Sequence, residues 1–303
     1  MRLFIVAFLL AFAAPASAQE RIVINAEAYY PEGPLWYGGR LLYTEMGADR
    51  VRAWDGRENS EVWKRAGCGP TSIADGGAGT LIVLCHLQNA LARIDLNGAT
   101  LAIIDRDDKG ARFATPNASI NDAKGGIYFS SSGIFSPLAP AEGSVLYLPA
   151  GQDVPRRVAS AIHYANGVAL ARGGRTLFVS EHLERRVLAY PVQDDGLLGL
   201  RRVFVELDRV APAGPRGWEV GPDGLAVDRR GNLFIAEYGA GRVLVVDAKG
   251  ALVATIPIPE RYVTAPVFGP DEARVFVTAP SNNTTPPFVG KVYSIANPVF
   301  RKD

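Results

Sequence analysis

Four polar side chains stand at equivalent places in the sequence, each at the entry of a short apolar run. They belong to the segments EGPLW, PNASI, ANGVAL and PDGLAV, and they are Glu32, Asn117, Asn166 and Asp223. Two carboxylates and two amides offer oxygen donors, which are the ligands that hard divalent cations prefer. These residues therefore predict a cation site, with Ca²⁺ as the first choice and Mg²⁺, Mn²⁺ or Zn²⁺ as alternatives.

The alternative interpretation is that these are turn residues, because Asn and Asp before Gly favour turns and tolerate left-handed backbone. It fits Asn166 poorly, since the hairpin turn is expected at ARGGRT, from Ala171 to Thr176, so that Asn166 lies at the entry of a strand. It also leaves the recurrence unexplained, because two other repeats have Pro70 and either Thr264 or Ala265 at this place. We therefore favour the metal site.

The pattern that positions the four residues recurs six times. Each copy has a polar or Pro/Gly entry, an apolar strand, a Gly/Asp turn and a second apolar strand, and several copies continue with Arg-Val at the start of a third. The copies come roughly every 47 residues, beginning near Glu32, Gly69, Thr115, Ala165, Pro222 and Thr264. No segment shows sustained helical periodicity. Short strands at this spacing are typical of propeller blades, so we expect an all-β, six-bladed β-propeller with four-stranded blades in one domain, residues 19–303.

The last repeat has little chain left for a fourth strand, whereas RIVINAEA, from Arg21 to Ala28, precedes the first repeat without a blade. An N-terminal strand that completes the last blade would remove an exposed sheet edge. Because the first strand of each blade lines the central channel, the entry residues should converge at one end of that channel.

The composition points to a small-molecule partner. The 303 residues carry 32 basic and 31 acidic side chains without a block of like charges, so nothing indicates a nucleic acid or an anionic membrane as partner. A monomer is expected. The opening MRLFIVAFLLAFAAPASAQE reads as a signal peptide ending at Ala18, and no later apolar run is long enough to cross a bilayer. The protein is therefore expected in the periplasm or outside the cell.

The two cysteines, Cys68 and Cys85, lie on either side of the expected turn DGGAGT, in strands that should pair antiparallel. In an oxidising compartment a disulfide between them is plausible. Reduced, they would be two small apolar residues. A cysteine-based zinc site is improbable with two cysteines and three scattered histidines.

The segments EGPLW, PNASINDAKGGIYFS, ANGVALARGGRTLFVSEH and PDGLAVDRRGNLFIAEYGAGRV resemble the SMP-30/gluconolactonase/LRE-like family of six-bladed propellers. The resemblance covers nearly all of the chain after the signal peptide. It implies a divalent metal held by Glu32, Asn166 and Asp223, with Asn117 as a further ligand or a substrate contact. Hydrolases of this family open lactones and related propellers cleave phosphotriesters, so the fold does not fix the substrate. The family usually has Asp where Ala118 stands, which puts a sugar-acid lactone in doubt.

The ends of the second strands should return beside the entries of the first strands. This places the following residues, or their immediate neighbours, around the mouth of the pocket: Glu45, His86, Ser131, His182 and Tyr238. Histidine titrates near neutral pH and is the usual proton carrier. His86 and His182 are therefore candidate catalytic residues, with a hydrogen-bonded structural role as an equally weighted alternative.

The expected function is metal-assisted hydrolysis of a lactone. The cation would polarise the carbonyl, and Asp223 or one of the two histidines would activate water. One alternative is a non-catalytic exported propeller that binds a ligand or a protein around a structural cation. Others are a phosphotriesterase-like hydrolase and a metal-independent propeller similar to the strictosidine synthase relatives, against which the complete set of oxygen donors argues. The sequence has no G-x-S-x-G motif to indicate a serine nucleophile.

Overall fold

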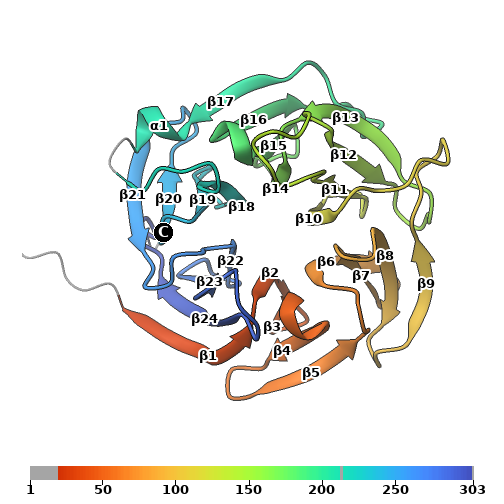
Figure 1. Cartoon of the computed structure of the whole chain (residues 1–303), viewed down its shortest axis with the longest axis horizontal. Coiled ribbons are helices and arrows are strands. Elements are labelled where there is room, and N and C mark those ends of the chain that lie inside the picture. The colour runs from red at the N-terminus through yellow and green to blue at the C-terminus, as the bar shows by residue number, and fades with distance from the viewer. Residues whose placement is uncertain (1–19, 212–213, 302–303) are drawn as a thin grey trace, which may run out of the picture.

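The computed structural model describes residues 20–211 and 214–301; the predicted signal peptide lies outside these residues. Within them, the strands form six four-stranded antiparallel sheets arranged around a central channel (Figure 1). The expected six-bladed β-propeller is confirmed. The helical elements are short, namely η1 (Met46–Ala48), η2 (His182–Glu184) and α1 (Leu207–Val210). In the described part of the chain, none of the helices has the length and apolarity that crossing a bilayer requires.

The first three blades follow the chain order, with each first strand innermost. Blade 1 contains β2 (Pro31–Tyr37), β3 (Arg40–Glu45), β4 (Arg50–Trp54) and β5 (Asn59–Lys64). Blade 2 contains β6 (Pro70–Gly77), β7 (Thr80–Cys85), β8 (Ala90–Asp95) and β9 (Thr100–Ile104). Blade 3 contains β10 (Pro116–Asn121), β11 (Ile127–Ser131), β12 (Gly143–Leu148) and β13 (Arg156–Ile162).

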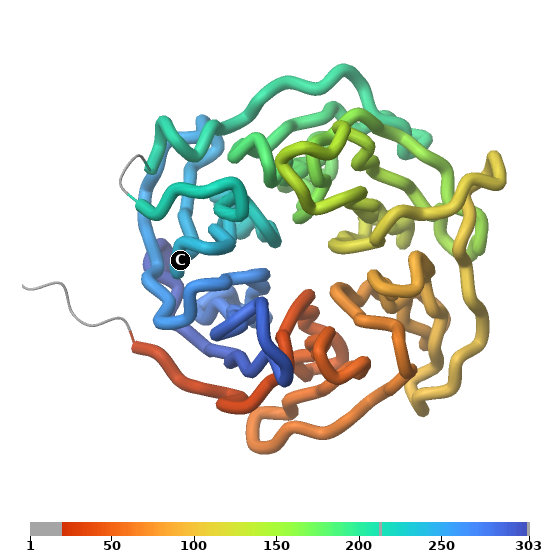
Figure 2. Tube along the Cα trace, viewed as in Figure 1, coloured from red at the N-terminus to blue at the C-terminus, as the bar shows by residue number. Residues whose placement is uncertain are grey.

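The last three blades close the ring. Blade 4 contains β14 (Ala165–Leu170), β15 (Thr176–Glu181), β16 (Arg186–Pro191) and β17 (Arg202–Glu206). Blade 5 contains β18 (Gly221–Val227), β19 (Leu233–Tyr238), β20 (Arg242–Val246) and β21 (Leu252–Pro257). Blade 6 contains β22 (Ala265–Phe268), β23 (Arg274–Pro280) and β24 (Val289–Ala296), and its outer strand is β1 (Arg21–Tyr29). The red N-terminal strand lies beside the blue C-terminal one, so the expected closure by the N-terminal strand is confirmed (Figure 2).

The apolar runs of the second and third strands make the core. In blade 2, β7 reads TLIVLC and is buried along almost its whole length, because neighbouring blades cover both of its faces. Leu42 and Val51 of blade 1, for example, pack in one cluster with Ile73 and Val83 of blade 2. Side chains packed between blades fix each blade against its neighbours, and they hold the inner strands in place around the channel.

The repeated Arg-Val at the start of third strands has a structural reason. In three blades the valine is fully buried, and the arginine pairs with a buried glutamate at the end of the second strand. The pairs are Glu45–Arg50 at 2.7 Å, Glu181–Arg186 at 2.6 Å and Glu237–Arg242 at 2.5 Å. These glutamates are therefore structural, since each uses its charge to hold the turn between two strands.

Cys68 and Cys85 form the expected disulfide, with 17 residues of sequence separation. The bridge ties the entry of β6 to the end of β7, immediately before His86. A cross-link of this length restricts the unfolded chain by an amount worth ~3 kcal/mol. We expect the Cys68→Ser/Cys85→Ser variant to lose about this much unfolding free energy in a denaturant titration. An unchanged midpoint and slope, with the wild-type bridge verified by mass spectrometry, would contradict this expectation.

Candidate active site

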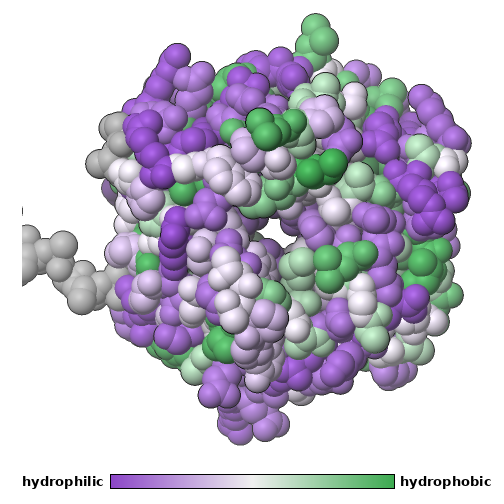
Figure 3. Space-filling view, viewed as in Figure 1, coloured by the Kyte–Doolittle hydropathy of each residue, from purple (hydrophilic) through white to green (hydrophobic). Residues whose placement is uncertain are grey.

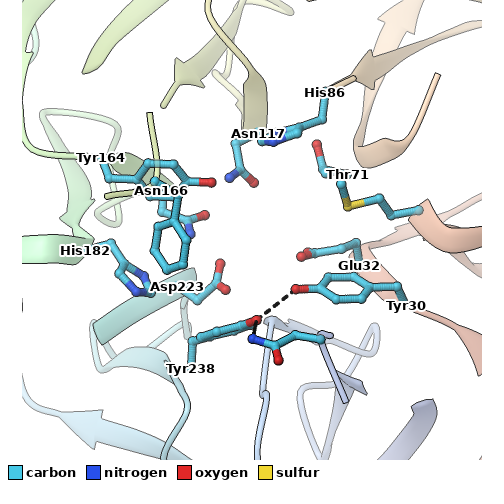
Figure 4. A pocket seen from close by; sticks show the side chains of 13 residues that line it. Tyr30, Glu32, Thr71, His86, Asn117, Tyr164, Asn166, His182, Asp223 and Tyr238 are labelled. Carbon is cyan, nitrogen blue, oxygen red and sulfur yellow. Dashed lines mark hydrogen bonds between the residues drawn. The ribbon is translucent and has the colours of Figure 1, made fainter. Parts of the chain in front are cut away.

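A cavity of about 190 Å³ lies at one end of the central channel. The structure brings together in its lining the predicted metal-binding and catalytic residues, namely the donors Glu32, Asn117, Asn166 and Asp223 and the histidines His86 and His182 (Figure 4). The four donors come from the inner strands of blades 1, 3, 4 and 5. They also line a second, smaller cavity of the channel, about 50 Å³, where Ala118 is found.

A β-bulge occurs at each of the four donors. In β2, the pair Glu32 and Thr44 is followed by the pair Leu35 and Leu42, so the inner strand has one residue more than its neighbour. The same irregularity occurs in β10, β14 and β18, between residues 116 and 119, 165 and 168, and 222 and 225. A bulge breaks the alternation of a strand and redirects a side chain. By contrast, β22 pairs with β23 without a register shift, and it provides no donor.

Glycine follows three of the donors, and it allows neighbouring inner strands to approach at backbone contact. A Cβ atom at Gly167 would lie 2.1 Å from the carbonyl oxygen of Asp223. At Gly33 it would lie 2.2 Å from the carbonyl oxygen of Thr71, and at Gly224 2.6 Å from that of Thr264. Of the three, Gly33 has a positive φ, of 31°. Gly167 is therefore required by this close approach and not by a turn.

Hydroxyl groups reinforce these contacts between blades. Each donates to a backbone carbonyl of the following inner strand or its immediate flank, and together they connect four pairs of neighbouring blades. The bonds run from Thr71 to Pro116 at 3.2 Å, from Ser132 to Ala165 at 2.6 Å, from Ser180 to Asp223 at 2.7 Å and from Thr264 to Pro31 at 2.8 Å. The backbone of the donor ring is thus held by hydroxyl groups at four of the six junctions between blades.

The cavity concentrates negative charge without a compensating basic side chain. Glu32 and Asp223 are 8% and 5% exposed. Among the described residues that line the cavity, none is lysine or arginine. Burial raises the pKa of both carboxyl groups well above the ordinary value, and for Glu32 the neighbouring charge of Asp223 raises the pKa further. A bound cation would compensate the charge of these two carboxylates.

The amide groups fit a divalent cation as well. Asn117 donates from Nδ2 to Ser132 Oγ at 3.1 Å, which leaves its oxygen free for the channel. Asn166 Oδ1 is buried and has no hydrogen-bond partner among the described residues, although an amide oxygen in such a place normally accepts a bond. The four side chains point toward a common centre (Figure 4). The donor set therefore fits a hard divalent cation, which would satisfy this oxygen and neutralise both carboxylates.

The two histidines differ in their surroundings. His86 Nδ1 lies 3.1 Å from the carbonyl oxygen of Pro116, so this nitrogen carries the hydrogen and Nε2 keeps its lone pair. His182 Nε2 donates to the carbonyl of Glu219 at 3.0 Å, and its ring is 1% exposed, edge-on to Phe135. Burial lowers the pKa of both rings to about 4, so both are neutral at pH 7. His86, which is half-buried, suits a proton acceptor better than His182, which is packed into the wall.

Three side chains that also line the cavity are connected by hydrogen bonds. The hydroxyl groups of Tyr30 and Tyr238 are 2.9 Å apart, and Asn283 Nδ2 donates to Tyr238 Oη at 2.9 Å (Figure 4). Burial raises the pKa of both tyrosines, so they keep their hydroxyl hydrogens. One of these hydrogens lies between the two oxygens, and the other is available to the cavity. Tyr30 and Asn283 were not predicted from the sequence, because neither belongs to a repeated motif.

For two of the residues expected at the pocket mouth, the next residue in the chain takes the expected place. Glu45 is bonded to Arg50, and the next residue, Met46, lines the cavity. Ser131 bonds to the backbone of Ala114, whereas its neighbour Ser132 contacts Asn117. A similar shift occurs at the entry of blade 2, where Thr71 rather than Pro70 lines the cavity, because Thr71 follows its proline as Glu32 and Asp223 follow theirs.

Comparisons with known proteins agree with this architecture. Residues 30–281 match the model of the SMP-30/gluconolactonase/LRE-like region. The lactonase drp35 of Staphylococcus haemolyticus is 30% identical over 173 residues, which are 54% of this chain and 51% of that protein. The chain thus spans about half the length of the curated relatives it matches.

Solved structures cover nearly the whole chain. A gluconolactonase from Xanthomonas campestris is 25% identical, with a TM-score of 0.74 over 92% of this chain and 90% of that one. A protein described as the calcium-binding regucalcin of Agrobacterium tumefaciens has a TM-score of 0.76 at 17% identity, over 91% and 93% of the two chains. The second likeness concerns the fold alone.

Proposed function

The chain belongs to the SMP-30/gluconolactonase/LRE-like family, and on that premise we propose that it is a metal-dependent hydrolase that opens a lactone. The observation that carries the proposal is the ring of two buried carboxylates and two amides, with an unpaired amide oxygen and without a basic side chain among the described lining residues. The names of the relatives, lactonase and gluconolactonase, support a cyclic ester as the substrate.

The residues that would hold the cation are Glu32, Asn117, Asn166 and Asp223, with Ca²⁺ as the first choice and Mg²⁺, Mn²⁺ or Zn²⁺ as alternatives. When bound, the cation would polarise the lactone carbonyl as a Lewis acid. The calcium-binding description of the Agrobacterium protein supports the choice of metal only through the shared fold.

The other side chains of the cavity have roles of their own. Nε2 of His86 accepts a proton from the attacking water, because Nδ1 is held by the carbonyl of Pro116. Asp223 is the alternative proton acceptor. The hydrogen of the Tyr30–Tyr238 pair that remains available is donated to the oxygen that leaves the ring. His182 positions the wall of the cavity through its bond to Glu219 and its contact with Phe135.

The test is hydrolysis of aliphatic, aromatic and sugar lactones by the purified protein. Turnover is measured before chelation, after chelation, and after each of the four cations is restored. We expect activity to disappear on chelation and to return with one of the cations. Turnover that survives complete removal of metal would contradict metal dependence, and absence of turnover with every cation would contradict lactone hydrolysis.

Replacing His86 by glutamine should lower kcat by about 10²- to 10⁴-fold, the usual contribution of a general base, with the metal content unchanged. His163→Gln is the matched control, because His163 bonds to Glu184 and does not line the cavity. Since the pKa of His86 is lowered to about 4, its ring is neutral above that pH. With saturating metal, the acid limb of kcat/KM should therefore lie below pH 5. A limb near pH 6.5 that disappears in His86→Gln would contradict the lowered pKa of His86, and a kcat that is unchanged in His86→Gln would refute its role as the base.

We also propose that the protein works in the periplasm or outside the cell. The apolar N-terminal segment that ends in ASA supports this location. The disulfide between Cys68 and Cys85 supports it independently, because such bonds persist in oxidising compartments. Fractionation of cells that express the full chain, followed by sequencing of the mature N-terminus, is the test; an uncleaved cytoplasmic product would overturn the proposal.

A further inference from the structure

Three exposed apolar side chains stand next to residues that line the cavity, either in the sequence or through a ring contact. They are Leu87, Ile134 and Trp218, which are 60%, 58% and 50% exposed, and we call them the apolar rim. Leu87 directly follows His86 of the cavity, and Ile134 directly precedes Phe135. The ring of Trp218 lies 5.0 Å from that of Phe135. Apolar surface is visible beside the central opening in Figure 3.

The position of the rim distinguishes it from other exposed apolar side chains. Several of those stand on outer strands, such as Leu101 and Ile103 on β9, far along each blade from the channel. The rim residues come instead from three connections, those between β7 and β8, between β11 and β12, and before β18. Exposed apolar groups beside a pocket are typical of a binding surface, whereas scattered ones need no explanation.

An aromatic wall connects the rim to the interior of the cavity. From Trp218 it passes to Phe135, and from there to Tyr164, whose ring lies 4.7 Å from that of Phe135. Phe135 and Tyr164 both line the cavity together with the donors. A ligand that starts at the donors therefore meets a continuous apolar and aromatic surface as it leaves the cavity.

Charge and size restrict the ligand further. A cation and the two carboxylates of Glu32 and Asp223 would cancel, and no lysine or arginine is present among the described lining residues to receive an anionic substituent. A cavity of about 190 Å³ is smaller than the pockets that enclose drug-sized ligands, which begin at ~300 Å³. It has room for a small ring, and a longer substituent has to lie along the wall and over the rim.

We propose that the substrate is an uncharged lactone that carries an alkyl or aryl substituent, with its ring at the donors and the substituent on Phe135 and the apolar rim. The inference rests on the proposed lactone hydrolysis and adds the substrate class. In the reaction, the water oxygen bonds to the carbonyl carbon and the ring C–O bond breaks. The leaving oxygen takes a proton, and the product is a hydroxy acid with the same substituent.

The first experiment is a series of γ-lactones whose substituent grows from hydrogen to hexyl. We expect kcat/KM to rise roughly two- to fourfold for each methylene, the upper value corresponding to ~0.8 kcal/mol for a fully buried group. A γ-lactone with a carboxylate-terminated chain of the same length should lose most of this gain. Glucono-1,5-lactone, which has hydroxyl groups in place of an apolar chain, should fall below the hexyl lactone.

Variants of the apolar rim test whether this surface binds the substituent. We compare kcat/KM for the hexyl lactone with kcat/KM for the unsubstituted lactone. This ratio should be at least tenfold lower in the triple variant Leu87→Ser/Ile134→Ser/Trp218→Ala than in the wild type, mainly through KM. Leu101→Ser is the matched control, because it removes an exposed leucine from the outer strand β9. Its ratio should equal that of the wild type.

The outcomes separate this inference from the proposed function. If the wild type opens the unsubstituted lactone but kcat/KM does not change along the series, the substrate class is wrong and lactone hydrolysis stands. Equal losses in the triple variant and in Leu101→Ser would also overturn the inference. If no lactone is opened, the proposed function fails and the substrate class with it. A further measurement is co-sedimentation with phosphatidylcholine vesicles. If the wild type co-sediments, the triple variant does not, and kcat/KM stays constant along the lactone series, the rim binds a membrane surface instead.

Discussion

The variant Asp223→Asn is expected to lose lactone hydrolysis by on the order of 10³-fold, comparable to the loss of a main electrostatic contact to the transition state, and to lose tight cation binding at the same time. The substitution keeps the shape of the side chain but removes one of two buried negative charges. A ring with a single carboxylate, Glu32, no longer compensates a divalent cation. Metal content measured on the dialysed protein and kcat/KM on the best lactone check both parts.

A control for Asp223→Asn is available at the other end of the same strand. Asp228 is also buried, but it accepts bonds from the backbone of Arg230 and Asn232 in the turn that follows β18. Asp228→Asn should lower stability and leave metal content unchanged. If Asp223→Asn retains both activity and normal metal content, the assignment of Asp223 as a ligand is wrong.

Removal of the metal is expected to lower the melting temperature by at least about 5 °C. A ligand present at 100 times its Kd stabilises the folded state by ~2.7 kcal/mol, and for a chain of this size each kcal/mol corresponds to roughly 2–4 °C. Calorimetry with and without chelator, at equal protein concentration, measures the difference. The double variant Glu32→Gln/Asp223→Asn should show no effect of chelator, since it has no carboxylate in the ring.

The effect of chelation should grow with pH. In the metal-free protein the pKa values of Glu32 and Asp223 are raised by burial, so between the ordinary carboxyl pKa of ~4 and the raised values the folded state binds more protons than the unfolded state. The metal-free stability therefore falls as pH rises through this window, whereas the metal-bound ring stays ionised. The gap in melting temperature should be wider at pH 8 than at pH 5. A gap that narrows with pH would show that the carboxylates are not the ligands.

The sequence was sufficient for the fold and for the common location of the four oxygen-bearing side chains, because both depend on a repeated pattern. Entry positions such as Glu32 and Asn166 recur at blade spacing, and antiparallel pairing then places His86 and His182 beside them. At blade 2 the prediction was one position too early, because it took Pro70 as the entry residue. Thr71 lines the cavity, and it follows Pro70 as Glu32 follows Pro31.

Residues outside the repeats could not be predicted in the same way. Tyr30 reaches the cavity because β1 completes blade 6 and the chain then turns directly into β2. Asn283 lies in the connection that precedes β24, where the sequence indicates only a loop. Trp218 is also a loop residue, and its proximity to Phe135 follows from the packing of loops from different blades.

The glycine contacts between blades also bear on ion selectivity. At Gly33, Gly167 and Gly224 the neighbouring inner strands already meet backbone to backbone, so at these three junctions between blades the ring resists contraction around an ion of smaller radius. A small cation could then engage only part of the donor set and would keep more of its water shell, whereas a larger one could contact opposite sides of the ring. In the proposed cation site, discrimination between Ca²⁺ and Mg²⁺ would accordingly be set by the circumference of the propeller.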